Sequence, residues 1–510
     1  MAETKREIER KYEATGETPV PDLTRVSGVA AVVDRGVMEL DAVYYDTPDL
    51  RLAADALTLR RRTGGDDAGW HVKFPVASGI RDEVRAPLAD TLPGELAELL
   101  RSRVRGDEVV PVVRLRSARD VRHLVTEDGT LLAELSVDTV HAERLPGGAE
   151  ATWTEIEVEL ADDTDPAVLD AVEKRLRKAG IRPSAAASKL ARALTETGPG
   201  PRPAATPGTP GTPGTPGTAG AAVLAYVREQ TDAIVTYDPA VRRDLPDAVH
   251  QLRVACRRMR SAFKTYRRVL DRNVTDALGE ELKWLAGELG VARDQEVLDK
   301  RLRAHVAELP DTLVLGPVKA RLRHRDAARG GHARRQALAA LDSPRYLALL
   351  DDLHALLADP PLRKAAGRDA GKVLARAVRK DHDRLAGRVE HALSLDPGHD
   401  RDLALHEARK AAKRARYAAD AARPTLGKPA KRLSKRVKGV QSVLGEHQDA
   451  VVARAALREL GLQSHGFGES AFTWGLLYGR EEAAAAAAER ELPEVWARAS
   501  APKLTAALTR

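Results

Sequence analysis

Charged residues alternate with apolar ones in several short stretches of the first 200 residues. Glu7, Glu9 and Lys11 do so near the N-terminus, and Glu157 and Glu159 do so near residue 160. Other same-face sets lie between them: Arg60 with Arg62, His71 with Lys73, Arg114 with Arg116, and Glu134 with Asp138. Residues two apart in a β-strand project from one face. Carboxylates placed there could bind hard divalent cations, and arginines and lysines could bind phosphate oxygens.

The opposite face of each predicted strand is largely apolar. It carries Ile8, Leu57, Leu59, Val72, Leu115, Leu135, Val137, Ile156 and Val158. An antiparallel sheet with one face in water shows the same alternation. An enclosed charged face is favoured because the polar positions are fully charged, with acids on the first and last strands and cations between them. A barrel closed with this face inward would form a tunnel, and helices are expected at about 93–103 and 165–179.

This half of the chain resembles the CYTH superfamily, the triphosphate tunnel metalloenzymes. The resemblance rests on Glu7-x-Glu9-x-Lys11, on residues 45–48, 59–62, 70–73 and 155–159, and on Ser188-Lys189, all in the expected order. It covers about residues 1–197. It implies an α+β domain built as an eight-stranded antiparallel tunnel, with metal-dependent hydrolysis of triphosphates or cyclisation of ATP.

The resemblance also implies roles for single residues. Mg²⁺ or Mn²⁺ would be held by Glu7, Glu9, Glu157 and Glu159, and catalysis would rest on Glu7, Glu9 and Lys11. Phosphate would be bound by Lys11, Arg60, Arg62, Lys73, Arg114, Arg116 and Lys189. The family often continues with arginine after Arg116, whereas this chain has Ser117 and Ala118 before Arg119. No adenine pocket is visible in the sequence, so hydrolysis is favoured over cyclisation.

The chain divides in charge and in composition near residue 200. The whole chain has 82 Lys+Arg and 75 Asp+Glu, a net charge of +7; residues 1–200 carry −9 and residues 201–510 carry +16. Such a difference in net charge indicates that the two halves of the chain have different functions. Proline at every third position of 206–217 prevents helix and sheet pairing. We therefore expect a barrel domain at 1–197, a linker at 198–221 and a helical domain at 222–510.

The second half has helical periodicity and an internal repeat. Helices are expected to start near 222, 245, 275, 294, 344, 368, 402, 429, 449 and 470. Residues 250–260 align with 406–416 at an offset of 156, and every basic position of the first segment is basic in the second. Residues 289–294 align with 444–449 at an offset of 155. Two copies of one helical unit predict a pseudo-twofold arrangement.

Basic side chains recur on one face of a helix in both copies. The first stripe is His250, Arg253, Arg257, Arg260 and Lys264; the second is His406, Arg409, Lys413 and Arg416. Further candidates are Arg258, Lys283, Lys410, Arg414, Lys435 and Lys438. A solvated basic face is the ordinary explanation, and a lone histidine is often structural. Because like charges four apart repel by about 0.2–0.5 kcal/mol per pair and few acids relieve them, an anionic ligand is the alternative.

This half resembles the CHAD domain, named for its histidines. The resemblance rests on residues 249–254, 257–258, 285–287 and 292–294 in the first copy, and on His406, Lys410, 413–417 and 444–449 in the second. It runs from about residue 222 to the end. It implies two four-helix bundles related by a pseudo-twofold axis, with a basic surface that binds inorganic polyphosphate through the candidates above. Aromatic residues make up 4% of the chain, which disfavours nucleic acid as the ligand.

The two halves together predict a polyphosphate-associated protein that binds and hydrolyses inorganic triphosphate. The alternatives are a non-catalytic polyphosphate-binding protein, an organic triphosphatase, an adenylate cyclase and a nucleic-acid-associated protein. The single cysteine, Cys256, excludes an internal disulfide framework. The charged N-terminal residues and the lack of a long apolar stretch predict a cytoplasmic protein without membrane contact, and association with polyphosphate granules is a further expectation.

Overall fold

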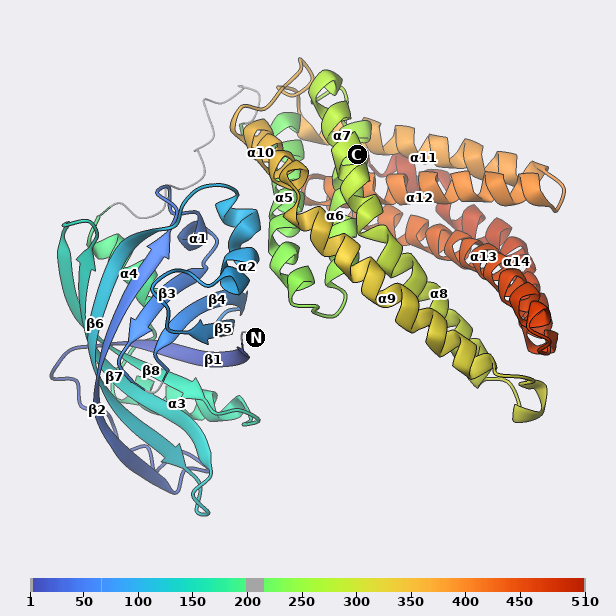
Figure 1. The fold of residues 1–510 in the computed structure, drawn as a ribbon. Helices are drawn as coiled ribbons and strands as arrows, with labels where there is room; N and C mark the ends of the chain where they lie inside the picture. The colour runs from blue at the N-terminus through green and yellow to red at the C-terminus, as the bar shows by residue number, and fades with distance from the viewer. Residues whose placement is uncertain (1–2, 66, 199–214, 509–510) are drawn as a thin grey trace. The chain divides into compact units, whose positions relative to one another are not determined.

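The computed structural model describes residues 3–65, 67–198 and 215–508 (Figure 1). The chain forms two compact units, Met1–Thr206 and Pro207–Arg510. Most of the linker predicted at 198–221, namely 199–214, lies outside the described residues. Its last residues belong to a helix, because α5 begins at Ala219, where the side chain of Thr218 accepts a hydrogen bond from the Ala221 backbone N–H (3.3 Å).

In the described part of the first unit, eight antiparallel strands close into a barrel, in the order β1-β5-β4-β3-β2-β6-β7-β8. The strands are β1 (Glu3–Ala14), β2 (Ala31–Asp46), β3 (Thr58–Thr63), β4 (Gly69–Ala77), β5 (Ile80–Pro87), β6 (Val110–Val125), β7 (Leu131–Arg144) and β8 (Glu150–Leu160). The predicted antiparallel tunnel is confirmed. A closed barrel leaves no exposed sheet edge, so every strand is paired on both sides.

Alternation along the strands separates a charged inner face from an apolar outer face. Helix α2 (Gly94–Val104) packs its leucines against outward-facing Trp70 and Val72. Helix α3 (Ala167–Lys178) packs against outward-facing Tyr12 and Ile156. Burying apolar area in this way contributes about 25 cal/mol per Å². The predicted helices at 93–103 and 165–179 are confirmed.

Helix α4 (Lys189–Glu196) was not expected from the sequence, nor was the short α1 (Arg51–Ala54). Ser188 caps α4 by accepting a hydrogen bond from the Ala191 backbone N–H (3.0 Å). The apolar residues of α4 pack into a cluster with Tyr44, Leu115, Val140 and Trp153. This cluster fixes the first residue of the helix, Lys189, beside the charged interior.

The described part of the second unit is helical throughout. Its elements are α5 (Ala219–Arg242), α6 (Ala248–Thr265), α7 (Arg272–Glu288), α8 (Gly290–Ala307), the 3₁₀ turn η1 (Asp311–Leu313), α9 (Val318–Asp342), α10 (Pro344–Ala358), α11 (Ala370–Ser394), α12 (His399–Leu426), α13 (Lys428–Gly466), α14 (Phe472–Ala499) and α15 (Pro502–Ala506). Among the described residues, no helix is both long and apolar enough to cross a membrane.

The sequence repeat recurs in the order of the helices. At an offset of 155 or 156 residues, α5, α6, α7 with α8, and α9 correspond to α11, α12, α13 and α14, with α10 between the two copies. The first copy breaks at Leu289, whereas α13 continues through the equivalent Leu444 (Figure 1). The expected start near 449 is therefore wrong, because the helix does not stop there, and α9 was not predicted. Helices α6 and α12 pack together around one core, so their basic stripes are neighbours.

Candidate functional site

A charged cavity of about 280 Å³ lies inside the barrel. Nine cationic and six carboxylate side chains line it among the residues that the structure describes. They are Lys5, Lys11, Arg60, Arg62, Lys73, Arg81, Arg85, Arg119 and Lys189, with Glu7, Glu9, Asp67, Glu134, Glu157 and Glu159. The excess of cations suits a ligand that carries several negative charges.

A row of carboxylates crosses three strands of the cavity wall. Glu9 of β1 lies opposite Glu159 of β8, which lies opposite Glu134 of β7. Like charges directly opposite each other destabilise a sheet, so this row requires cations. Lys5 Nζ lies 2.7 Å from Glu159 Oε1, and Lys11 Nζ lies 3.2 Å from Glu9 Oε2. Carboxylate oxygens are also the ligands that Mg²⁺ and Mn²⁺ prefer, so the donor set fits such an ion.

A second group of carboxylates is neutralised by the chain itself. Ligand oxygens of Asp138, Glu155 and Glu157 all lie within 4.8 Å of one another. Lys189 Nζ lies 2.8, 2.8 and 2.5 Å from these three groups. Burial lowers the pKa of Lys189, but the three carboxylates outweigh this effect and raise it above its usual range. Burial raises the pKa of Glu157, but Lys11 and Lys189 outweigh this effect and hold it well below its usual range. Lys189 therefore stays charged and anchors α4 to the barrel.

The cations on the facing wall are positioned by buried acids. Lys73 Nζ donates to Glu7 Oε2 at 2.5 Å and lies 3.5 Å from Glu83 Oε1. The fully buried Glu83 also interacts with His71 Nδ1 (2.9 Å) and Arg60 Nη2 (3.3 Å). Burial raises the pKa of Glu7, although Lys73 acts in the opposite direction. Fixed cations of this kind can bind an anion without a large rearrangement.

The basic stripes of α6 and α12 crowd their charges together. Burial and repulsion from Arg409 and Arg257 together lower the pKa of Lys413 to about 8. The Nε atoms of Arg257 and Arg260 are shielded from water and make no hydrogen bond with any described residue. A cleft of about 330 Å³ beside them is lined by five cations, Arg260, Lys264, Arg267, Arg272 and Arg414, and by two acids, Asp276 and Glu280. This excess of cations favours an anionic ligand.

Both copies place one arginine beside an equivalent glycine, although the hydrogen-bond partners of the two arginines differ. Arg253 Nη1 donates to the Gly290 carbonyl oxygen at 3.2 Å, and Arg409 Nη2 lies 3.5 Å from Asp449 Oδ1. A Cβ on Gly290 would lie 3.0 Å from the Arg253 guanidinium, and one on Gly445 would lie 3.7 Å from that of Arg409. Glycine thus leaves room for the arginine at position 290, whereas a Cβ at position 445 would make only an ordinary van der Waals contact. The side chains of 291–295, which include Asp294 of the motif, lie outside the described residues.

Comparison with known proteins agrees with this two-unit architecture. The CYTH domain profile matches residues 5–194, and the CHAD domain profile matches residues 225–458. Two uncharacterized proteins of Mycobacterium tuberculosis, MT2285 of strain CDC 1551 / Oshkosh and Rv2226 of strain H37Rv, are each 38% identical over 496 residues. The alignments cover 93% of this chain and 92% of each relative. The chain belongs to this CYTH–CHAD family.

Two solved structures are similar to part of the chain. PptA from Streptomyces chartreusis is 25% identical with a TM-score of 0.47, and the match covers 55% of this chain and 99% of that one. The CHAD domain from the plant Ricinus communis is 26% identical with a TM-score of 0.45, and the match covers 56% of this chain and 92% of that one.

Most of the predicted residues of the CYTH domain share the cavity. Glu7, Glu9, Lys11, Arg60, Arg62, Lys73, Glu157, Glu159 and Lys189 all line it. Arg114 and Arg116 do not. Arg114 pairs with Asp41 (2.5 Å) and Arg116 with Glu143 (3.4 Å), and their side chains are 41% and 53% exposed. The structure corrects the expectation that these two arginines join the phosphate site, because their side of β6 faces away from the cavity.

Arg119 occupies the place expected for that pair. Its guanidinium donates to both oxygens of Asp138 (2.7 and 2.8 Å) and to Glu157 (2.7 Å). Sequence reasoning missed it because Leu115 was assigned to the outer face, whereas Leu115 packs with α4 on the inner one. Arg119 and Asp138 are directly opposite in the β6–β7 register, a charge complementarity that could have revealed the correct face. Glu134 and Lys5 were likewise absent from the predicted site.

In the CHAD domain, several predicted cations have partners within the chain. His406 Nδ1 is hydrogen bonded to Gln448 Oε1, and Arg414 Nε lies 3.0 Å from Asp381. Lys283 pairs with Glu280 (3.0 Å), and Lys410 pairs with Glu407 (2.7 Å).

The remaining predicted cations of the CHAD domain lie on α6, α12 and α13. Arg258 and Arg416 lie over the ring of Tyr417, at 5.9 and 4.8 Å from its centroid. Lys435 and Lys438 are exposed on α13, and on α6 Lys264 is exposed whereas His250 is half-buried. The stripes of α6 and α12 are therefore brought together, and Arg416 of the α12 stripe meets Arg258 of α6 at Tyr417. The α13 lysines form an additional basic patch.

Proposed function

We propose that the CYTH domain hydrolyses inorganic triphosphate with a divalent metal ion and that the CHAD domain binds inorganic polyphosphate. The observation that supports the first part most strongly is the barrel cavity, walled by cations and carboxylates together. Inorganic triphosphate is a compact polyanion without base or sugar. A cavity whose lining is so largely charged matches it better than it matches an adenine nucleotide, which would need an apolar or stacking surface.

The chain's own residues would divide the work by charge. Arg60, Lys73 and Arg119 would hold phosphoryl oxygens and neutralise the charge that develops on them during transfer. Glu9, Glu134 and Glu159, with Glu7 and Glu157 beside them, offer oxygen ligands for Mg²⁺ or Mn²⁺. When bound, the metal would polarise the phosphorus and lower the pKa of a bound water. The closed wall would limit competing water, leaving the anion fixed for attack.

The proposal for the CHAD domain rests on the duplicated stripes. Cations at spacings of three and four residues on the packed helices α6 and α12 match a ligand with negative charge at every phosphate. Phe263 and Tyr266 are buried in the core, so they offer no stacking platform for bases. Long polyphosphate should therefore displace RNA or DNA from the full-length protein, and RNA or DNA should not displace polyphosphate.

Phosphate release from tripolyphosphate tests the CYTH proposal. We expect release with Mg²⁺ or Mn²⁺, none with EDTA, and loss of at least 100-fold in rate for Glu9→Gln. Glu13→Gln is the matched control, because Glu13 lies on the same strand but contacts Ser184 and Arg192 instead of lining the cavity. Both variants should bind long polyphosphate like the wild type. Equal rates for Glu9→Gln and the wild type would refute the assignment.

A second candidate function is binding of polyphosphate without turnover. It is favoured by one observation: Lys189 and Lys11 already neutralise Glu157, so part of the cavity needs no metal. No phosphate release with either metal, combined with tight tripolyphosphate binding that Arg60→Ala weakens, would establish this candidate in place of hydrolysis.

A further inference from the structure

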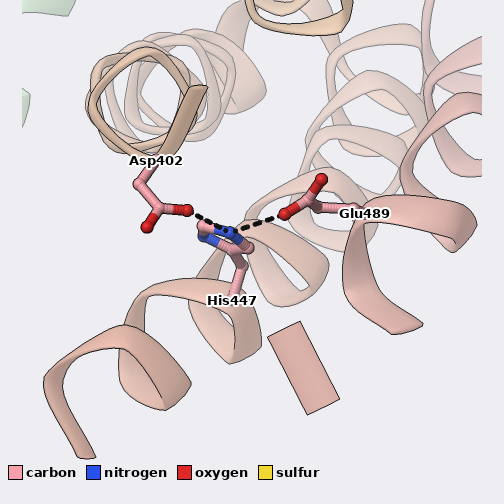
Figure 2. Close-up of side chains that lie close together, drawn as sticks. All are labelled: Asp402, His447 and Glu489. Carbon is pink, nitrogen blue, oxygen red and sulfur yellow. Dashed lines mark ion pairs between the residues drawn. The ribbon is translucent and has the colours of Figure 1, made fainter. Parts of the chain in front are cut away.

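Three helices of the second CHAD copy bring an imidazole and two carboxylates together (Figure 2). Asp402 comes from α12, His447 from α13 and Glu489 from α14. His447 Nε2 lies 3.1 Å from Asp402 Oδ1 and 3.3 Å from Glu489 Oε1. The His447 side chain is 3% exposed, whereas the two carboxylates are partly open to solvent at 23% and 18%.

The contacts within this group leave the imidazole unsatisfied. His447 Nε2 is shielded from water and makes no hydrogen bond that satisfies distance and angle with any described residue. A single ring nitrogen carries one hydrogen or one lone pair, so it cannot serve two carboxylates at once. Figure 2 shows it directed between them. An unpaired, buried polar atom of this kind destabilises the folded state unless a ligand pairs with it.

The spacing of the three atoms suits a small cation. Metal–nitrogen and metal–oxygen bonds of about 2.0–2.2 Å place neighbouring ligand atoms about 3.0–3.5 Å apart. The two distances to His447 Nε2 fall in this range, and all three ligand atoms lie within 4.8 Å of one another. A cation at their centre would replace an unsatisfied nitrogen and two facing carboxylates by three metal–ligand bonds.

Neighbouring arginines fix the carboxylates in this orientation. Arg454 Nη2 donates to Asp402 Oδ2 at 3.2 Å, and Arg401 Nε lies 3.1 Å from Glu489 Oε2. Each arginine contacts the oxygen that points away from His447, so the other oxygen of each carboxylate remains directed toward the imidazole. Ligating carboxylates are commonly held in this way by a second partner.

We propose that Asp402, His447 and Glu489 bind a divalent first-row transition-metal ion, for which Zn²⁺ is the probe. An imidazole nitrogen selects such ions over Mg²⁺ and Ca²⁺, so the site differs in preference from the all-oxygen donor set of the barrel. The site belongs to one copy only, because Ala292 stands at the repeat position of His447. The bound ion would join α12, α13 and α14.

Zinc stoichiometry of the full-length protein tests the proposal. Wild type and His447→Gln are dialysed against buffered free Zn²⁺ at pH 7.5, and bound metal is measured by mass spectrometry. His465→Gln is the matched control, since His465 is exposed on the same helix. We expect His447→Gln to bind one equivalent fewer than both other proteins. The same number of zinc ions in all three would overturn the proposal and leave an ion-pair network only.

Two further measurements keep the test decisive. If His447→Gln lowers the helical circular dichroism, Asp402→Asn decides instead, because it keeps the volume of the side chain and removes one charged ligand. It too should bind one zinc fewer. Zinc should also raise the melting temperature of the wild type more than that of either variant, because an ion that binds only the folded state stabilises it. An equal rise in all proteins would contradict the proposal.

Discussion

At the scale of single residues, the opposite faces of β6 give the sharpest contrast. Arg119 donates to two carboxylates inside the barrel, whereas Arg116 is more than half exposed on the outer face. A lysine at 119 would keep the charge but lose the planar fork that holds these groups. We expect Arg119→Lys to lower kcat/KM for tripolyphosphate about 10–100-fold. This loss corresponds to the contribution of one hydrogen bond to a charged group, about 1.5–3 kcal/mol. Arg116→Lys should change it less than twofold, and equal losses in both variants would contradict the site.

The pKa of Lys413 gives a second prediction at this scale. In the free protein burial and neighbouring arginines lower this pKa to about 8. A bound polyanion would favour the charged form and raise the pKa again, so binding takes up a proton above pH 8. Polyphosphate affinity should therefore be constant below about pH 8 and fall above it, by at most about tenfold per pH unit.

The control for this titration is Lys413→Arg, which stays charged throughout the range. Dissociation constants measured from pH 7 to 10 should show a weaker fall for this variant than for the wild type. Parallel pH profiles would mean that Lys413 does not contact the ligand.

At the scale of elements, the glycine at the start of α8 controls the position of an arginine. A Cβ on Gly290 would lie 3.0 Å from Arg253 Nη2, so Gly290→Ala should shift that guanidinium and weaken polyphosphate binding several-fold. Gly387→Ala in α11 is the control, because nothing lies within 4 Å of its added Cβ. It should raise stability by about 0.5–1 kcal/mol, as alanine does in a helix interior, without changing affinity. Identical affinities for both variants would show that Arg253 is not part of the binding surface.

The elements also show what the sequence could and could not predict. Period-two alternation was sufficient to assign the strands and most of their charged faces, because a one-residue slip would move every charge to the other face. Closure into an eight-stranded barrel was predicted from the resemblance to the CYTH superfamily. The alternation failed at β6, where apolar Leu115 packs with α4 inside the barrel and breaks the rule that the inner face is charged. The prediction of a separate helix start near 449 was also wrong, because α13 passes through Leu444 and Gly445 without a break. A helix can continue through a glycine when packing on both sides supports it. The Asp402–His447–Glu489 group lies beyond such reasoning, since its members are 42 or more residues apart.

At the scale of the whole molecule, the proposal joins two phosphate-binding domains in one chain. Tethering raises the concentration of one domain's ligand at the other. A protease site introduced within 206–217 should, after cleavage, leave hydrolysis of tripolyphosphate unchanged and slow phosphate release from long chains. The measurement is release from both substrates before and after cleavage. Unchanged rates on both would show that the domains act independently.

Polyphosphate binding by the intact protein should also depend strongly on ionic strength. Each cation that neutralises a phosphate releases a condensed counterion, so affinity falls steeply with salt. Residues 201–510 carry 54 of the 82 basic residues, so the helical domain should account for most of this slope.

The lysines that neutralise the barrel carboxylates bear on the order of events in a catalytic cycle. Lys5, Lys11, Lys73 and Lys189 each form an ion pair with a carboxylate of the cavity. A metal ion arriving alone would compete with these lysines for the same carboxylates, whereas an ion arriving with triphosphate would bring negative charge that the lysines can bind. Metal and anion should therefore load as a complex, each strengthening the retention of the other. Under the proposed function, the four lysines would bind the phosphates in place of the carboxylates and return to the carboxylates when the phosphates leave.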